Sequence, residues 1–96
     1  MKIDINTNNG VLTVSLEGRL DTTTAPELEA ALADNLNSTT ELTFNCDGLV
    51  YISSAGLRVL LSAHKKMKGA MKLTGVCELV MEVLEMTGFS DIFVIE

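Results

Sequence analysis

The stretch LVYISSAGLRVLL, residues 49–61, decides the fold class, because the spacing of its apolar residues changes in the middle. Residues 49–52 form an apolar run typical of a strand, whereas from Gly56 the leucines recur at the spacing of one helix face. Ser53 and Ser54 lie between the two patterns, where a serine hydroxyl often accepts hydrogen bonds from the free amides of a helix's first turn. We therefore expect a strand that leads into a helix, with the serines at the junction.

The rest of the chain shows the same two periodicities in alternation. The patterns predict strands at residues 2–7, 11–16, 41–46, 71–76 and 92–95, and helices at 24–36, 56–69 and 77–87. The first two strands form a hairpin across Asn8-Asn9-Gly10, and helices and strands alternate after it. This order favours an α/β fold: a single domain over residues 1–96, with a mixed, mostly parallel sheet of four to five strands and three helices.

Three local signals refine this prediction. Residues 18–24 read as a polar connection, and Asp47-Gly48 reads as a turn after the third strand. Thr24 and Glu27 have the spacing of a capping box, in which the hydroxyl and the carboxylate bind free amides at a helix start. Gly69 is a plausible end for the helix that begins at Gly56.

Composition and charge exclude several classes of function. The net charge of −6 disfavours nucleic acid as a partner, and no apolar run approaches the ~20 residues of a membrane span. No signal-like apolar block opens the chain, so we expect a cytoplasmic protein without membrane insertion. Five of the seven basic residues fall between Gly48 and Val76, a stretch without acids. They form either a solvated helix face or a surface for an acidic partner.

Catalytic and metal-binding arrangements are not apparent. His64 is the only histidine, and on one helix it would lie roughly 15 Å from Ser54, too far to activate that hydroxyl. We interpret it as a structural residue. Cys46 and Cys77 lack metal or redox spacing and are expected to be buried free thiols. No phosphate-binding or dinucleotide motif is present, so we expect no cofactor, no metal and no enzymatic activity.

Two motifs resemble those of STAS domains, the family that includes bacterial anti-sigma factor antagonists. VYISSAGLRVLL, residues 50–61, is similar to the family signature, and EGRLDTTTAPELE, Glu17–Glu29, is similar to its second motif. The order of strands and helices also matches. The resemblance implies a binding module controlled by an anti-sigma factor with serine kinase activity and reset by a serine phosphatase. Many members continue into a final helix, whereas this chain stops at Glu96.

The resemblance also assigns roles to residues. The signature usually reads Asp-Ser-Ser/Thr-Gly-Leu, and its first hydroxyl accepts phosphate. Alignment on Gly56 places Ser54 at that position, with Ser53 where the family often has Asp and Ala55 where it often has a hydroxyl. Ser53 is thus a rival phosphoacceptor, although we expect it to be the helix cap. The expected partner-binding residues are Asp21, Thr22, Thr23, Ser53, Ala55, Gly56, Arg58 and Ser62.

A second reading remains open. The chain could be a STAS subunit that binds constitutively in a transport or signalling assembly, without a kinase cycle. Ser54 would then serve only as a cap, and the absence of Asp at position 53 favours this alternative. A small hydrolase is the weakest reading because of the distance between Ser54 and His64.

Overall fold

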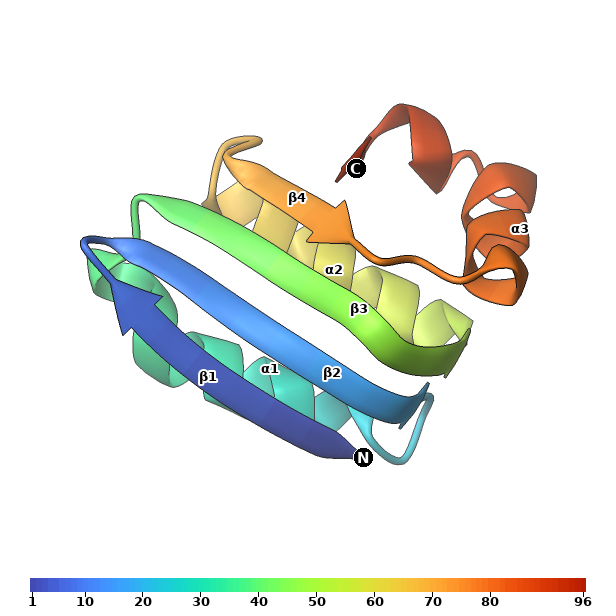
Figure 1. Cartoon of the computed structure of the whole chain (residues 1–96), viewed down its shortest axis with the longest axis horizontal. Helices are drawn as coiled ribbons and strands as arrows, with labels where there is room; N and C mark the ends of the chain where they lie inside the picture. The colour runs from blue at the N-terminus through green and yellow to red at the C-terminus, as the bar shows by residue number, and fades with distance from the viewer.

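The computed structural model describes residues 1–96 as one five-stranded sheet with three helices (Figure 1). The strands are β1 (Lys2–Asn8), β2 (Val11–Leu20), β3 (Glu41–Ile52), β4 (Met71–Thr74) and β5 (Val94–Ile95). The helices are α1 (Ala25–Asn35), α2 (Ser54–Lys66) and α3 (Glu78–Met86), with 3-10 turns at Leu36–Ser38 and Phe89–Asp91. The strands keep sequence order across the sheet; β1 is antiparallel to β2, and the other pairs are parallel. This confirms the predicted α/β architecture and its N-terminal hairpin.

Both long helices cover the same face of the sheet. In Figure 1, α1 and α2 lie behind the strands, and no helix lies in front of them. Alternate residues of β2, namely Leu12, Val14 and Leu16, point into the layer between sheet and helices and are buried. They belong to a core of 21 buried residues that joins the sheet to all three helices. Aliphatic side chains dominate this core, as the composition requires.

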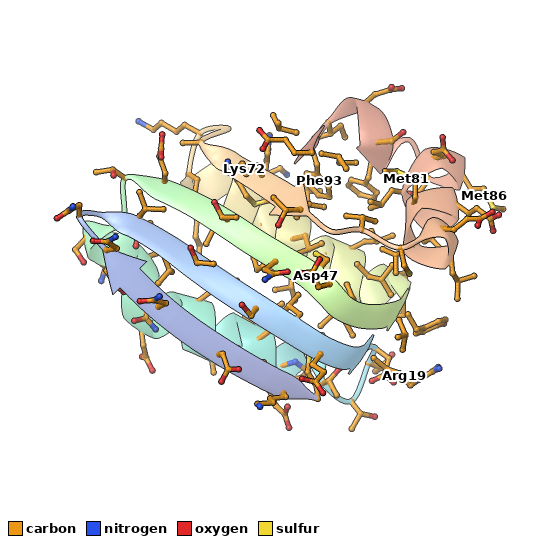
Figure 2. All side chains as sticks on the ribbon, viewed as in Figure 1. Arg19, Asp47, Lys72, Met81, Met86 and Phe93 are labelled. Carbon is orange, nitrogen blue, oxygen red and sulfur yellow. The ribbon has the colours of Figure 1, made fainter.

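The third helix packs near the ends of the central strands, where it contacts β3. Figure 1 shows α3 beyond the end of β4, and Figure 2 shows Phe93 and Met81 between β4 and α3. The buried ring of Phe93 lies 5.3 Å from the ring of Phe89 and 5.6 Å from that of His64. The half-buried His64 therefore packs against an aromatic cluster, as expected of a structural residue. None of the helices is both long enough and apolar enough to cross a membrane.

The expected turn at Asp47-Gly48 was wrong, because β3 continues without interruption to Ile52. Its extra residues are absorbed by two register shifts against β2, and Gly48 lies opposite Glu17 at the first of them. A Cβ on Gly48 would lie only 3.0 Å from the Glu17 Cγ. The glycine therefore permits close contact between strands at a bulge, and it does not form a turn.

The connection expected at residues 18–24 is partly strand. β2 runs to Leu20 because it pairs with the full length of β3, and Leu20 lies opposite Ile52 at the far end. The second helix starts earlier than predicted, at Ser54, and its last turn is followed by Gly69 with a φ of +87°. β4 is shorter than predicted because Gly75, with a φ of +67°, takes the chain out of extended conformation.

Candidate functional site

The start of α2 is fixed to the end of β2 by the backbone. The Ser53 N–H donates a hydrogen bond to the Leu20 carbonyl (2.9 Å), and the Ser53 carbonyl accepts one from the Leu57 N–H (2.9 Å). Ser53 itself is extended, with φ of −106° and ψ of 176°, so it is the N-cap residue by backbone geometry. Ser54 is consequently the first residue of the helix, and its position is set by the sheet beneath it.

The two serine hydroxyls have different environments. The Ser53 Oγ is buried and has no hydrogen-bond partner, so it does not cap α2, contrary to our expectation for this residue. Ser54 is exposed at the surface. An enzyme approaching from solvent thus meets the Ser54 hydroxyl and not that of Ser53. No side chain satisfies the free amides of the first turn of α2.

Asp21 organises the loop between β2 and α1. Its Oδ1 accepts hydrogen bonds from the N–H groups of Thr23 (3.0 Å) and Thr24 (3.2 Å), and its own N–H donates to the Thr24 Oγ1 (2.9 Å). The Thr24 Oγ1 in turn donates to the Arg19 carbonyl (2.7 Å) and makes no capping bond to α1, so the predicted capping box was wrong. The backbone N–H of Thr24, above all, holds the pKa of Asp21 below its usual value of 3.8.

Arg19 joins this site, although sequence reasoning did not select it. Its guanidinium carbon lies 4.1 Å from the centre of the Tyr51 ring, and its Nε lies 3.7 Å from the Asp21 Oδ2. Arg19 and Tyr51 are register partners at the ends of β2 and β3, where Figure 2 shows Arg19. The signal that would have found this pair is the extension of β2 through residue 19, which the sequence pattern did not reveal.

Gly56 allows α2 to pack closely against the ends of β2 and β3. A Cβ on this residue would lie 2.7 Å from the Leu20 Cγ and 3.0 Å from the Ile52 Cγ1. Gly56 is buried, so it lies in the helix–sheet contact and not on the surface where we expected it to meet a partner. Its small size lets α2 approach the strands closely.

A shallow hollow of about 400 Å³ separates the first turn of α1 from α2. It is lined by Thr22, Ala25, Pro26, Glu29, Ala55, Arg58, Val59 and Ser62. We call this hollow the α1–α2 groove. Four of the expected partner-binding residues, Thr22, Ala55, Arg58 and Ser62, meet in it. Sequence reasoning missed the α1 residues of the lining, because the facing of α1 and α2 is a tertiary feature.

The remaining candidates for chemistry stay apart. Ser54 and His64 are ten residues apart on the same helix, so their side chains cannot form a catalytic pair. No cluster of three or more histidine, cysteine or acidic residues is arranged to hold a metal ion. Cys46 is buried and Cys77 only half-buried, and both are free thiols. The prediction of two buried thiols was therefore correct for Cys46 alone.

Comparison with known proteins gives consistent results. The family model described as STAS domain matches residues 2–96. A protein of Bordetella bronchiseptica named as an anti-sigma factor antagonist, BtrV, is 36% identical in an alignment that covers 97% of this chain and 84% of that protein. The anti-sigma-B factor antagonist of Bacillus subtilis is 26% identical, over 96% of this chain and 87% of its own. The crystal structure of an anti-sigma factor antagonist from Mycobacterium paratuberculosis has the same fold, with a TM-score of 0.86, 24% identity, and coverage of 98% and 83%.

Proposed function

Because the chain belongs to the STAS domain family, we propose that it is an anti-sigma factor antagonist switched off by phosphorylation of Ser54. In this proposal the unmodified protein binds an anti-sigma factor that has serine kinase activity, and so frees a sigma factor. The kinase then phosphorylates Ser54 and dissociates. A serine phosphatase restores the binding form. The names of two relatives that align over nearly the whole chain support the antagonist role.

The observation that carries the choice of residue is the contrast between the two serines. Ser54 is exposed at the first position of α2, whereas the Ser53 Oγ is buried. A kinase active site must reach the hydroxyl oxygen directly, and only Ser54 offers it without local unfolding. Ser54 also stands at a helix start, where phosphate is compatible with the helix dipole.

The surface around Ser54 supports a protein interface. The α1–α2 groove places Thr22, Arg58 and Ser62 on one side of the helix start, and the loop held by Asp21 presents the exposed Thr23 beside it. Both parts are fixed by backbone hydrogen bonds, so the free protein needs little reordering on binding. We assign partner binding to this groove and loop.

Phosphorylation opposes binding through charge and size. A phosphate adds about −1.5 to −2 charges at neutral pH, at the centre of this surface. Asp21 is already ionised there, since its pKa is lowered. A partner surface that fits a small neutral hydroxyl next to one carboxylate would meet both a larger group and an increased negative charge.

Incubation with the candidate kinase and ATP, followed by mass spectrometry, tests the proposal. We expect one phosphate on Ser54, none on the Ser54→Ala variant, and undiminished phosphorylation of Ser53→Ala as the matched control. In pull-down assays, Ser54→Ala should bind the kinase and resist release, whereas Ser54→Asp should bind poorly. Phosphate on Ser53 alone would overturn the assignment of the residue.

The constitutive STAS adaptor is the second candidate. It is favoured by Ser53, which stands where the family signature often has Asp, so that no carboxylate lies directly before Ser54 in the chain. In this case the kinase would leave no phosphate, and Ser54→Asp would bind its partner as well as the unmodified protein does. These two results together would replace the switch with the adaptor.

A further inference from the structure

Arg58 is an exposed cation without an ionic partner. The three ion pairs of the structure join Lys2 to Asp4, Arg19 to Asp21, and Lys72 to Glu96, so none includes Arg58. Arg58 lines the α1–α2 groove together with an acid, Glu29, but the two are not paired. Its guanidinium is therefore available to a new anion at this end of the molecule.

The position of Arg58 on α2 directs it towards Ser54. The two residues are four apart in one continuous helix, so they lie one above the other on the same face. Long side chains in a helix lean towards its N-terminus, which brings the guanidinium of Arg58 over the turn that Ser54 begins. An anionic residue four positions before a cationic one is also the more favourable order for a helical pair.

Arg19, the other cation near this end, is already engaged. It is stacked on Tyr51 and paired with Asp21, and its movement to a new anion would break both contacts. Arg58 would lose no ion pair by turning to a phosphate on Ser54. Of the two arginines, Arg58 is therefore the one that could pair with a phosphate without breaking an existing ion pair.

We infer that a phosphate on Ser54 captures Arg58 within the same helix, through charge-assisted hydrogen bonds between the guanidinium and the phosphate oxygens. This inference rests on the proposed function, since it concerns the modified form of Ser54. It assigns Arg58 two alternative partners: the docked protein when Ser54 is free, and the phosphate when Ser54 is modified.

The capture explains how one phosphate affects the whole surface. Arg58 shares the groove with Thr22 and Ser62, about one turn from the modified residue. When its guanidinium binds the phosphate, the groove loses its free cation. The phosphate therefore acts twice: it blocks the position of Ser54, and it withdraws a side chain with which an acidic group of the partner would pair.

A titration of the phosphate tests the pair directly. Phosphoserine is incorporated at position 54 during translation, into the full chain and into its Arg58→Gln, Arg58→Lys and Lys65→Gln variants, and phosphorus NMR follows its second ionisation. A nearby cation favours the dianion, so we expect Arg58→Gln to raise the phosphate pKa by roughly 0.3 unit or more. Arg58→Lys should give an intermediate value. Lys65→Gln, altered in the last turn of α2, should titrate like the parent phosphoprotein.

An unchanged phosphate pKa in Arg58→Gln would overturn the capture. The incorporation needs no kinase, so this result is independent of the proposed function: failure of the kinase to modify Ser54 would refute the switch but leave the titration interpretable. Binding measurements give a second criterion. Arg58→Gln should weaken partner binding several-fold in the unmodified protein and cause no further loss in the phosphoprotein. An equal loss in both forms would show that Arg58 stays with the partner and would also overturn the capture.

Discussion

Gly56 and Leu20 are in direct contact where α2 crosses the end of β2: a Cβ on the glycine would lie 2.7 Å from the Leu20 Cγ. Leu20 is fully buried and cannot move aside freely. The contact sets the depth of α2 on the sheet, and with it the position of Ser54. The residue at position 56 thus controls the position of Ser54 through packing.

We expect Gly56→Val to lower the free energy of unfolding by about 1–3 kcal/mol, because added methyl groups overpack this contact. Urea denaturation followed by circular dichroism measures the change. Ser62→Ala, on the exposed side of the same helix, is the control and should stay within about 0.5 kcal/mol of the parent. A combined Leu20→Ala and Gly56→Val variant should lose less than the sum of the two single losses, since alanine lacks the Cγ that the new side chain at position 56 would meet. Strict additivity would contradict the contact.

Ser53→Ala distinguishes a capping hydroxyl from an unsatisfied one. Removal of a capping serine typically costs about 1 kcal/mol. The Ser53 Oγ is buried without a partner, so its removal relieves a desolvated polar atom, and we expect the variant to be at least as stable as the parent. Thr24→Val is the matched control: its hydroxyl bonds to the Arg19 carbonyl, and its loss should cost about 1 kcal/mol. Denaturation midpoints measure both, and a destabilised Ser53→Ala would restore the capping role.

The order of the elements was predictable because it depends on local patterns. Alternating apolar residues mark β2, and helical spacing marks α2; in both, the buried face is visible in the sequence itself. The glycine at position 69 was also read correctly as the end of a helix, since its positive φ is one that glycine adopts readily.

Three of the errors share one cause: each depended on a residue from a distant part of the chain. Asp47-Gly48 has the composition of a turn, and only its pairing with β2 makes it a bulge. Serine is a residue type typical of helix N-caps, and only the packing around Ser53 leaves its hydroxyl without a partner. The Arg19–Tyr51 stack requires the register of two strands. The motif therefore predicted the junction between β3 and α2, while the contacts of individual side chains required the structure.

Asp21→Asn should show, through the dependence of stability on pH, that the ionised carboxylate of Asp21 stabilises the fold. The folded state lowers the pKa of Asp21, mainly through the Thr24 N–H, so its carboxylate stabilises the fold above the unfolded value of 3.8. This contribution is lost as the pH falls through the lowered pKa of the folded state. The variant, which keeps an acceptor oxygen but no charge, should melt at a lower temperature than the parent at neutral pH and converge with it in strong acid. Calorimetry across this range measures the difference, and an offset that is independent of pH would contradict the role of the charge.

The two thiols should differ in reactivity. Cys46 is buried, and burial raises its pKa to about 12, so it holds almost no thiolate near neutral pH. Cys77 is only half-buried. In the folded protein at pH 8, iodoacetamide should therefore modify Cys77 first, and peptide mass mapping identifies the site. In denaturing urea both should react at similar rates, which serves as the control, and preferential modification of Cys46 in the folded state would contradict the burial.

The raised pKa of Cys46 also leads to a prediction for alkaline pH. The pKa of Cys46 is about 12 in the folded state and near its ordinary 9.0 when unfolded, so unfolding above pH 9 releases a proton. The stability that the neutral thiol contributes is complete below pH 9 and is lost progressively as the pH rises towards 12. Cys46→Ala removes this pH-dependent contribution to stability. The denaturation midpoint of the variant should therefore fall less steeply between pH 9 and 11 than that of the parent protein. The slopes are compared between the two proteins so that contributions common to both cancel. Equal slopes would indicate that Cys46 ionises as readily in the folded chain as in the unfolded one.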